Sequence, residues 1–317
     1  MPPKRKNAED ADEKAKTTKT KKAKTDPTTP ENTQPTNKVL PVTITFPQKT
    51  PGTLRIATWN ICGLAASSKK GFKNYVEAED ADILVLTETK VNNEPVDPAL
   101  VNRYPYRYWS IADKKGYSGT AILSKFKPLN VNMALPGHPD PSEVKGRIIT
   151  LEFETCYLIG TYVVNAGQGL KTLDAKKEWN THFDTYIRDL DKRKPVIWTG
   201  DLNVAPTEMD LRNAKSNWNK SPGYTEVETT AFNNILNSPD APERFVDIWR
   251  QMHPDLRHYT YFSYRFNCRQ NGTGWRLDMF VLSEGIVERV KLCEIRDEIY
   301  GASDHCPVVM EFRSDGL

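Results

Sequence analysis

From Leu54 onward the sequence repeats one pattern, a short run rich in Ile, Leu and Val that ends in a polar residue. The length and composition of such runs are typical of buried β-strands. They occur at residues 54–61, 81–88, 106–112, 120–125, 147–154, 157–164, 195–202, 259–264, 277–283, 290–296 and 307–312. A helical composition at 69–80 and an amphipathic stretch at 170–193 separate some of the runs. Many strands with a few helices among them predict the α/β class, as a four-layered α/β sandwich of two packed mixed β-sheets flanked by helices.

The first 50 residues differ from the rest in composition. They carry 11 Lys and Arg against 6 Asp and Glu and have almost no large apolar side chains. Such a segment cannot bury enough surface to offset the entropy of ordering, so we expect a disordered basic tail over 1–50 and a catalytic domain over 51–317. Basic clusters at 3–6 and 19–24 suit a nuclear import signal. We expect a nuclear location, with the mitochondrion as an additional one; a solubilising tail without an address is the alternative.

Other classes are disfavoured by composition. The five cysteines are scattered and form no CxxC pair, which argues against a disulfide framework or a structural zinc site and favours a reduced intracellular compartment. No stretch approaches the roughly 20 apolar residues that cross a membrane. The first residues have no apolar core, so no secretory signal peptide is expected.

Polar residues at the strand ends carry the candidate chemistry. They are Asn60, Glu88, Tyr162, Asn165, Asp201, Asn203, Asp278, Asp304 and His305. Any one of them could simply begin a turn. Four carboxylates brought together would repel one another, so they need a cation among them or protonation. Oxygen ligands favour Mg²⁺ or Mn²⁺ over zinc, and Mg²⁺ commonly works beside phosphates. The set therefore suits metal-assisted hydrolysis of a phosphate ester.

Eight motifs, in order along the chain, carry a resemblance to a known family. They lie at residues 57–64, 86–90, 115–124, 146–153, 161–170, 199–213, 274–280 and 303–308. The series is similar to that of exonuclease III-type (class II) AP endonucleases, which belong to the endonuclease/exonuclease/phosphatase superfamily. The pieces "YVVNAG", "DLRN" and "GWRLD" are the ones that indicate the AP endonuclease branch.

The resemblance implies a function. We expect an Mg²⁺-dependent DNA-(apurinic or apyrimidinic site) endonuclease of base excision repair, in which Mn²⁺ can substitute. It would cut the phosphodiester 5′ to an abasic site, leaving 3′-OH and 5′-deoxyribose phosphate. Side activities would be a 3′→5′ exonuclease and a 3′-phosphodiesterase. The expected partner is double-stranded DNA containing abasic sites, and no association with a membrane is expected. The chain would be a monomer, and its tail could bind repair proteins.

The resemblance also implies residue roles. The metal would be held by Glu88, Asp304, Asn60, Asp201 and Asn203. Asp201 would align or deprotonate the attacking water, Asn203 would steady the transition state, and Tyr162 would contact the scissile phosphate. His305 would bind a phosphate oxygen while Asp278 orients and charges its ring. The expected substrate contacts are Asn165, Gln168, Asn217, Tyr261, Arg265, Arg269, Trp275 and Leu277.

This chain departs from the family pattern at three positions. Cys62 stands where many members have an acid or amide near the metal, and Gln168 where some animal members have an Arg. Ala57 replaces the cysteine that some mammalian members use for redox control, so that activity is not expected.

A serine-nucleophile triad in "SDHC" is disfavoured, because the family pattern assigns His305 to Asp278. The alternatives are another phosphodiesterase of the superfamily (sphingomyelinase, inositol polyphosphate phosphatase, mRNA deadenylase or retrotransposon endonuclease) and a non-catalytic DNA-binding protein.

Overall fold

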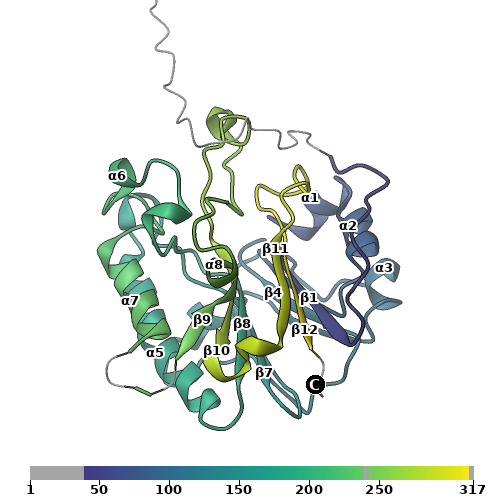
Figure 1. Cartoon of the computed structure of the whole chain (residues 1–317), viewed down its shortest axis with the longest axis horizontal. Helices are drawn as coiled ribbons and strands as arrows, with labels where there is room; N and C mark the ends of the chain where they lie inside the picture. Colours follow the sequence, from purple (N-terminus) through teal and green to yellow (C-terminus); the bar gives the residue numbers. More distant parts are fainter. Residues whose placement is uncertain (1–38, 239–240, 243, 314–317) are drawn as a thin grey trace, which may run out of the picture. The chain divides into compact units, whose positions relative to one another are not determined.

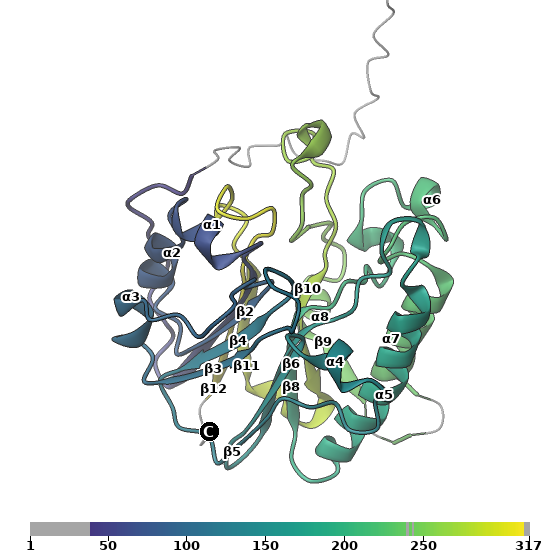
Figure 2. The same cartoon turned by 180° about the vertical axis from the view of Figure 1, so that it is seen from behind.

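Two β-sheets pack face to face, with helices on their outer faces (Figures 1 and 2). The structure, a computed structural model, describes residues 39–238, 241–242 and 244–313. The first sheet has the order β11 (Val290–Ile295), β12 (Val308–Arg313), β1 (Thr53–Asn60), β2 (Ile83–Thr87), β4 (Thr120–Ser124), β3 (Tyr106–Ser110). The second has the order β5 (Asn130–Asn132), β6 (Ile148–Glu152), β7 (Tyr157–Tyr162), β8 (Val196–Asp201), β10 (Asp278–Ser283), β9 (Phe245–Asp247). The predicted four-layered sandwich of mixed sheets is confirmed.

Helices and 3₁₀ turns fill the connections between the strands. The α-helices are α1 (Leu64–Ser68), α2 (Phe72–Glu79), α3 (Pro98–Val101), α4 (Pro141–Val144), α5 (Leu173–Asp191), α6 (Ala214–Asn217), α7 (Glu226–Leu236) and α8 (Ile248–Met252). The 3₁₀ turns are η1 (Gln168–Leu170), η2 (Glu208–Asp210), η3 (Arg265–Asn267) and η4 (Glu284–Arg289). None of the helices in this described part has the length and hydropathy needed to span a membrane.

The core consists of three apolar layers that follow from the two-residue period of the strands. Ile56 of β1 belongs to the layer between the sheets, together with Ile197 of β8 and Phe280 of β10. Its neighbours along the strand, Ala57 and Trp59, face outward into the layer covered by α2. On the other side α5 and α7 cover the second sheet through side chains that include Trp179, Phe183, Phe232 and Ile235. Both sheets are thus buried on two faces, as the continuous apolar runs predicted.

The chain divides between the sheets by position in the sequence. Segments 53–124 and 290–313 form the first sheet, and segment 130–283 forms the second. The antiparallel pairing of β1 with β12 runs from Thr53 opposite Arg313 to Thr58 opposite Val308. The ends of the folded region therefore meet in one sheet.

Residues 39–50 lie against the domain, although the sequence places them in the tail. The side chain of Leu40 is 3% exposed and Phe46 packs edge-on against Tyr75 of α2. Lys49 pairs with Asp82 at 2.5 Å. Part of the segment predicted as tail thus packs on the domain, and residues 1–38 lie outside the described part of the chain.

One predicted strand is wrong. Residues 259–264 form only isolated bridges, in which Tyr261 pairs with Trp275 and with His305. The aromatic side chains there are anchored by packing, since Phe262 is 1% exposed, rather than by a continuous ladder.

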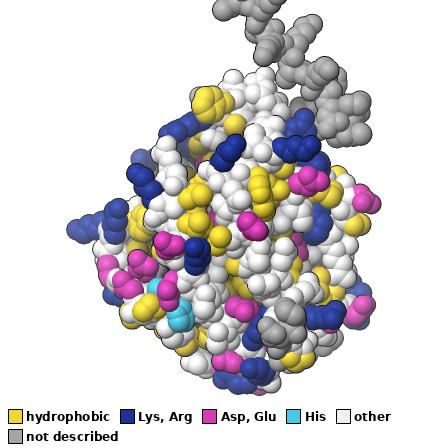
Figure 3. Space-filling model, turned by 90° about the vertical axis from the view of Figure 1, so that its left-hand side faces the viewer, with side chains coloured by type: hydrophobic (Ala, Val, Ile, Leu, Met, Phe, Trp, Pro, Cys, Tyr) yellow, Lys and Arg dark blue, Asp and Glu magenta, His cyan; other side chains and the backbone are white. Residues whose placement is uncertain are grey.

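On the face that Figure 3 shows, basic and acidic side chains are interspersed, so neither sign of charge dominates it.

Candidate active site

Four predicted site residues meet at one edge of the sandwich, and each sheet supplies two of them. Asn60 ends β1 and Glu88 follows β2 in the first sheet, whereas Asp201 ends β8 and Asp278 begins β10 in the second. Gly200 makes this end of β8 possible, because a Cβ there would lie 2.0 Å from the carbonyl oxygen of Thr161 on the neighbouring strand. Only glycine fits so close an approach of two backbones.

Asn60 joins the two halves. Its Nδ2 donates to Oδ2 of Asp201 at 2.9 Å and to Oε1 of Glu88 at 3.1 Å. Its Oδ1 accepts the N–H of Cys62 at 3.0 Å, which fixes the orientation of the amide. One buried side chain thus sets the positions of two carboxylates that belong to different sheets.

His305 makes the second link between the sheets. Its Nδ1 lies 2.7 Å from Oδ2 of Asp278, and both side chains are buried. Burial opposes the charged ring, but the charge and hydrogen bond of Asp278, followed by the charges of Asp201 and Asp304, raise the pKa of His305 to about 10. The ring is therefore a cation near neutral pH.

The same environment favours the neutral form of Asp201, whereas it favours the charged form of His305. It lies directly opposite Asp278 in the antiparallel pairing of β8 with β10. Burial, and then the charge of Asp278, raise its pKa to about 7, although His305 and the Asn60 amide oppose the rise. A carboxyl group that titrates near pH 7 is suited to accept a proton during a reaction.

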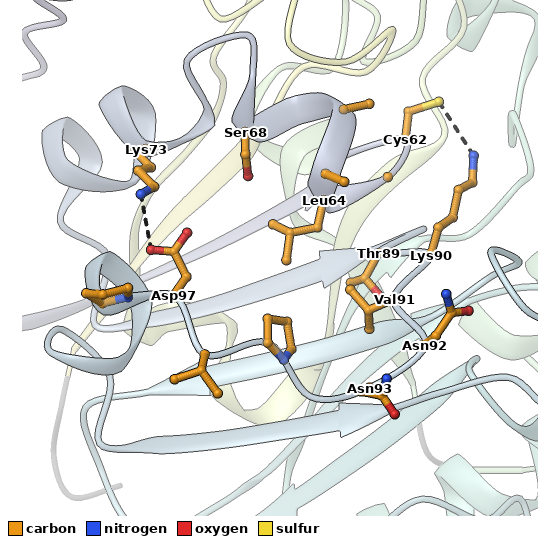
Figure 4. A pocket seen from close by; sticks show the side chains of 16 residues that line it. Cys62, Leu64, Ser68, Lys73, Thr89, Lys90, Val91, Asn92, Asn93 and Asp97 are labelled. Atoms are coloured by element: carbon orange, nitrogen blue, oxygen red, sulfur yellow. Dashed lines mark hydrogen bonds and ion pairs between the residues drawn. The ribbon is translucent and has the colours of Figure 1, made fainter.

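Glu88 lies in a different, cation-rich setting. Burial alone would raise its pKa, but the hydrogen bond and charge of Lys90 and the bond from Asn60 outweigh burial and lower it. The Lys90 Nζ is 2.8 Å from Oε2 of Glu88 and 3.7 Å from Sγ of Cys62, as Figure 4 shows for the thiol. The thiol is hydrogen-bonded to Asp304, and burial followed by the charge of Asp304 raises its pKa to about 11.

The donor set at this point fits a hard divalent cation. Glu88 and Asp304 both raise the pKa of Lys90 against the effect of burial, so both carboxylates lie near an ammonium, at a position that attracts positive charge. Asp201, Asp278 and His305 also carry ligand-type atoms within 4.8 Å of one another. However, a protonated imidazole has no lone pair to offer a metal, so the carboxylates are the better ligands.

Asn203 and Tyr162 lie beside Asp201: Asn203 follows it by two residues, and Tyr162 is opposite it in the pairing of β7 with β8. Asn203 adopts a positive φ of 51° and receives the Nδ2–H of Asn165 on its Oδ1 at 2.8 Å. Burial and then Glu88 and Asp201 raise the pKa of Tyr162 well above its usual value, so the phenol stays protonated. The guanidinium of Arg147 lies over the Tyr162 ring at 5.3 Å.

Three of the expected substrate contacts, Tyr261, Trp275 and Leu277, lie in segments next to His305 and Asp278. The Tyr261 ring centroid lies 4.9 Å from that of His305, and Tyr261 exchanges backbone hydrogen bonds with Trp275 at 2.8 and 2.9 Å. Trp275 also packs edge-on against Tyr224, and Leu277 is 8% exposed. The three predicted residues thus lie close to the candidate phosphate-binding histidine.

The remaining predicted contacts divide into exposed and buried residues. Asn165, Gln168 and Arg265 are exposed, whereas both polar groups of Asn217 bond within its own turn. Arg269 is a correction: it is 2% exposed and lies between the rings of Phe262 and Tyr300 at 4.5 and 4.6 Å. We therefore assign it to the base of the loop rather than to the substrate surface. Sequence reasoning could not separate it from Arg265, because both are arginines in one loop.

Two residues near the site were missed. Lys90 was read only as part of a motif, although it is the cation that pairs with Glu88. Phe266 is 87% exposed and has a positive φ of 59°, at the tip of the loop that carries Arg265. So exposed an aromatic on strained backbone signals an interaction surface. A cavity of about 760 Å³ adjoins the site on the side of Cys62 and Lys90 and extends to Lys73 and Asp97 (Figure 4).

Comparisons with known proteins identify the family of the chain. The sequence profile of the Endonuclease/Exonuclease/phosphatase family matches residues 57–305. DNA repair nuclease APEX1 of Danio rerio is 41% identical over 261 residues, covering 81% of each chain. The exodeoxyribonuclease of Bacillus subtilis is 41% identical over 257 residues, covering 80% of this chain and 98% of the relative.

Solved structures show the same arrangement. An AP endonuclease from Leishmania major superimposes with a TM-score of 0.71 at 28% identity, covering 86% of this chain and 93% of that one. An AP endonuclease from Archaeoglobus fulgidus superimposes with a TM-score of 0.69 at 27% identity, covering 82% and 99%. The predicted resemblance is confirmed.

Proposed function

The chain belongs to the endonuclease/exonuclease/phosphatase family and is a phosphodiester hydrolase, and we propose that it acts on double-stranded DNA at abasic sites in base excision repair. Relatives at about 40% identity carry the names of DNA repair nucleases, exodeoxyribonucleases and AP endonucleases. The products we propose are a 3′-OH and a 5′-deoxyribose phosphate.

The observation that carries the proposal is the pairing of a cation with a neutral-range base in one buried cluster. Asp278 holds His305 in its protonated form, and the same cluster raises the pKa of Asp201 to about 7. Hydrolysis of a phosphodiester needs a cation and a base together, because charge develops on the phosphate while the attacking water loses a proton. A binding protein would have no need for a carboxyl group poised at pH 7.

Each residue then has a definite part. Asp201 accepts a proton from the attacking water, and His305 donates a hydrogen bond to a non-bridging phosphate oxygen. Tyr162, which keeps its proton, donates a second hydrogen bond to the phosphate. Asn203 donates its amide toward the same group when its present bond to Val163 exchanges. Asn60 holds the carboxylates of Asp201 and Glu88 in position through its amide hydrogen bonds.

We propose Mg²⁺ as the cation, with Mn²⁺ as a substitute, held by Glu88 and Asp304. When bound, it would neutralise charge on the phosphate as the bond breaks. Oxygen-only ligands favour these hard ions over zinc. The raised thiol pKa keeps Cys62 protonated, so it is a weak competitor for a hard cation.

We propose that the residues around His305 give specificity for abasic sites. Tyr261, Trp275 and Leu277 would form apolar walls that accept a sugar without a base turned out of the duplex. The loop with Arg265 and Phe266 would contact the deformed helix: Arg265 binds the minor groove or a phosphate, and Phe266 stacks on an unpaired base. The exposed Asn165 and Gln168, together with Asn217, would bind flanking phosphates.

A nicking assay tests the proposal. In Mg²⁺, a duplex with one abasic-site analogue should be cut 5′ to the lesion, and EDTA should stop the reaction. A matched duplex with an intact base should remain whole, as should sphingomyelin and poly(A). Cutting of the intact duplex at the same rate, or full activity in EDTA, would contradict the proposal. A 3′-recessed and a 3′-blocked duplex in the same assay would measure the exonuclease and 3′-phosphodiesterase activities.

The tail supports a nuclear location through its two basic clusters, and we propose that it also recruits repair proteins. A fluorescent fusion of the full chain should accumulate in nuclei, and replacement of the lysines and arginine at 3–6 and 19–24 by glutamine should redistribute it. Unchanged distribution would leave the tail as a solubilising segment.

A further inference from the structure

Asn203 is held through almost every polar atom it has. Its N–H donates to Oδ1 of Asp201 at 2.9 Å and its Nδ2 donates to the Val163 carbonyl at 2.9 Å. Its Oδ1 accepts from Asn165. The residue is in the left-handed region, which asparagine tolerates better than other non-glycine residues, and these hydrogen bonds fix its orientation there. The remaining polar atom is its backbone carbonyl oxygen.

That carbonyl accepts a hydrogen bond from a buried ammonium. Lys176 of α5 is 1% exposed, and its Nζ donates both to the Asn203 carbonyl and to Oε1 of Glu228, the latter at 2.8 Å. A lysine is rarely so buried, because the charge loses its hydration and must be paired. Here the buried charge ends on the backbone of a candidate catalytic residue.

Glu228 is itself fixed by the chain that faces Asn203. Its two oxygens accept the N–H of Gly223 at 3.0 Å each, and Oε2 accepts the Thr225 hydroxyl at 2.8 Å. Thr225 also caps α7. At Gly223, a Cβ would lie 3.2 Å from the Asn203 carbonyl oxygen, so glycine lets this loop approach the same atom. Two helices and one loop therefore converge on one peptide group.

We infer that Lys176 and Glu228 are positioning residues for phosphodiester hydrolysis, which act by holding the Asn203 peptide in the conformation that directs its amide to the substrate. The inference rests on the role proposed above for Asn203. Without the ammonium, the buried carbonyl has lost its partner and the peptide can rotate out of this orientation. The amide would then turn away from the reacting phosphate, although no atom of Lys176 touches it.

Epistasis between Lys176 and Asn203 tests this inference. Lys176→Met should lower kcat on the abasic-site duplex by about 10- to 100-fold, since small displacements of a reacting group cost that much, and should leave KM within about twofold. The same change should have almost no effect on kcat in an Asn203→Gly background. Glycine tolerates the positive φ and has no amide to position. An equal loss of kcat in both backgrounds would overturn the inference, as would an unchanged kcat in the single variant.

Arg55 offers a matched control for a simple loss of stability. It is a buried cation that also bonds a carboxylate, Glu311 at 2.7 Å, and a backbone carbonyl, that of Glu79 at 3.1 Å, but at the other end of β1 from Asn60. Arg55→Met should lower the melting temperature at least as much as Lys176→Met and leave kcat within about twofold at a temperature where both are folded. A parallel loss of kcat in Arg55→Met would show that Lys176 acts only through stability.

A milder variant covers the case in which Lys176→Met does not fold. Glu228→Gln keeps the shape of the side chain and its acceptor for Gly223 but removes the ion pair. It should lower kcat by a smaller factor, and that loss should also vanish in Asn203→Gly; a loss that persists there would overturn the inference. Failure of the proposed function would show already in the unmodified chain, which would not nick the duplex, whereas failure of this inference shows only among the variants.

Discussion

Asp201 and Asp278 lie directly opposite each other on antiparallel strands, and both carboxylates are buried beside His305. Asp278 is bound to the histidine cation, whereas Asp201 is left to titrate near neutrality. The two acids in register thus have different partners, because only Asp278 bonds the histidine cation directly.

The first prediction is a bell-shaped pH profile. Asp201 must be deprotonated to accept a proton, so kcat/KM should rise as the pH passes about 7. His305 must be protonated to donate to the phosphate, so kcat/KM should fall as the pH approaches about 10. Initial rates from pH 5 to 11 at saturating metal would measure both limbs. A flat profile across pH 7 would remove Asp201 from the role of base.

The second prediction concerns Asp278→Asn. The change removes the main group that raises the pKa of His305 and the main charge that raises the pKa of Asp201. Both limbs of the profile should therefore move to lower pH, and kcat at pH 8 should fall by about 100-fold or more, as for the loss of a partner that orients a histidine. Ser303→Ala is a useful comparison, because Ser303 bonds the His305 backbone and not its ring.

The third prediction concerns competition for Glu88. Lys90→Met removes an ammonium 2.8 Å from the carboxylate that would hold the cation. Calorimetric titration should show Mg²⁺ binding tighter by about three- to fivefold, a modest change because the pair is partly exposed. Lys73→Met, on the far side of the same cavity and paired with Asp97 at 3.2 Å, should leave Mg²⁺ binding unchanged. Weaker binding in Lys90→Met would mean that Lys90 orients Glu88 instead.

The fourth prediction concerns the exposed loop tip. Phe266→Ala should weaken binding of the abasic duplex by about tenfold, the order expected for one lost stacking contact, while binding of intact duplex changes less. Fluorescence anisotropy in EDTA would measure affinity without cleavage. Leu129→Ala is the control: Leu129 is 57% exposed but lies beside β5, away from the loop. Equal weakening for both duplexes would assign Phe266 to general adhesion.

The fifth prediction separates two arginines of one loop. Arg265→Ala should lower DNA affinity and reduce its salt dependence, because Arg265 is exposed and available to phosphates. Arg269→Ala should instead reduce the free energy of unfolding by about 2–4 kcal/mol, because it leaves a cavity between two rings and a carbonyl without its donor. Denaturant titration together with binding at two salt concentrations would decide. Stability loss in Arg265→Ala alone would reverse the assignment.

The sequence predicted the sandwich and most of the site, because polar residues at the ends of buried strands must collect at sheet edges. Asn60, Glu88, Asp201 and Asp278 could be found in this way. Residues 39–50 were assigned to the tail, although Leu40 is buried and Phe46 packs on Tyr75, because contacts with distant residues are not visible in a local pattern. Lys176 was missed, and the burial of Arg269 was not foreseen, for a related reason: burial of a charged side chain depends on distant partners, such as Glu228 and Tyr300.

The pairing of β1 with β12 has a consequence for the synthesis of the chain. Asn60 and Glu88 leave the ribosome before Asp201 and Asp278, and Asp304, His305 and β12 follow all of them. A nascent chain can form the mid-chain sheet with Asp201 and Asp278 before β12 emerges, yet it cannot form the link between His305 and Asp278. We therefore expect nuclease activity to require synthesis through β12, and a premature stop before residue 303 to yield a chain that cannot cut DNA.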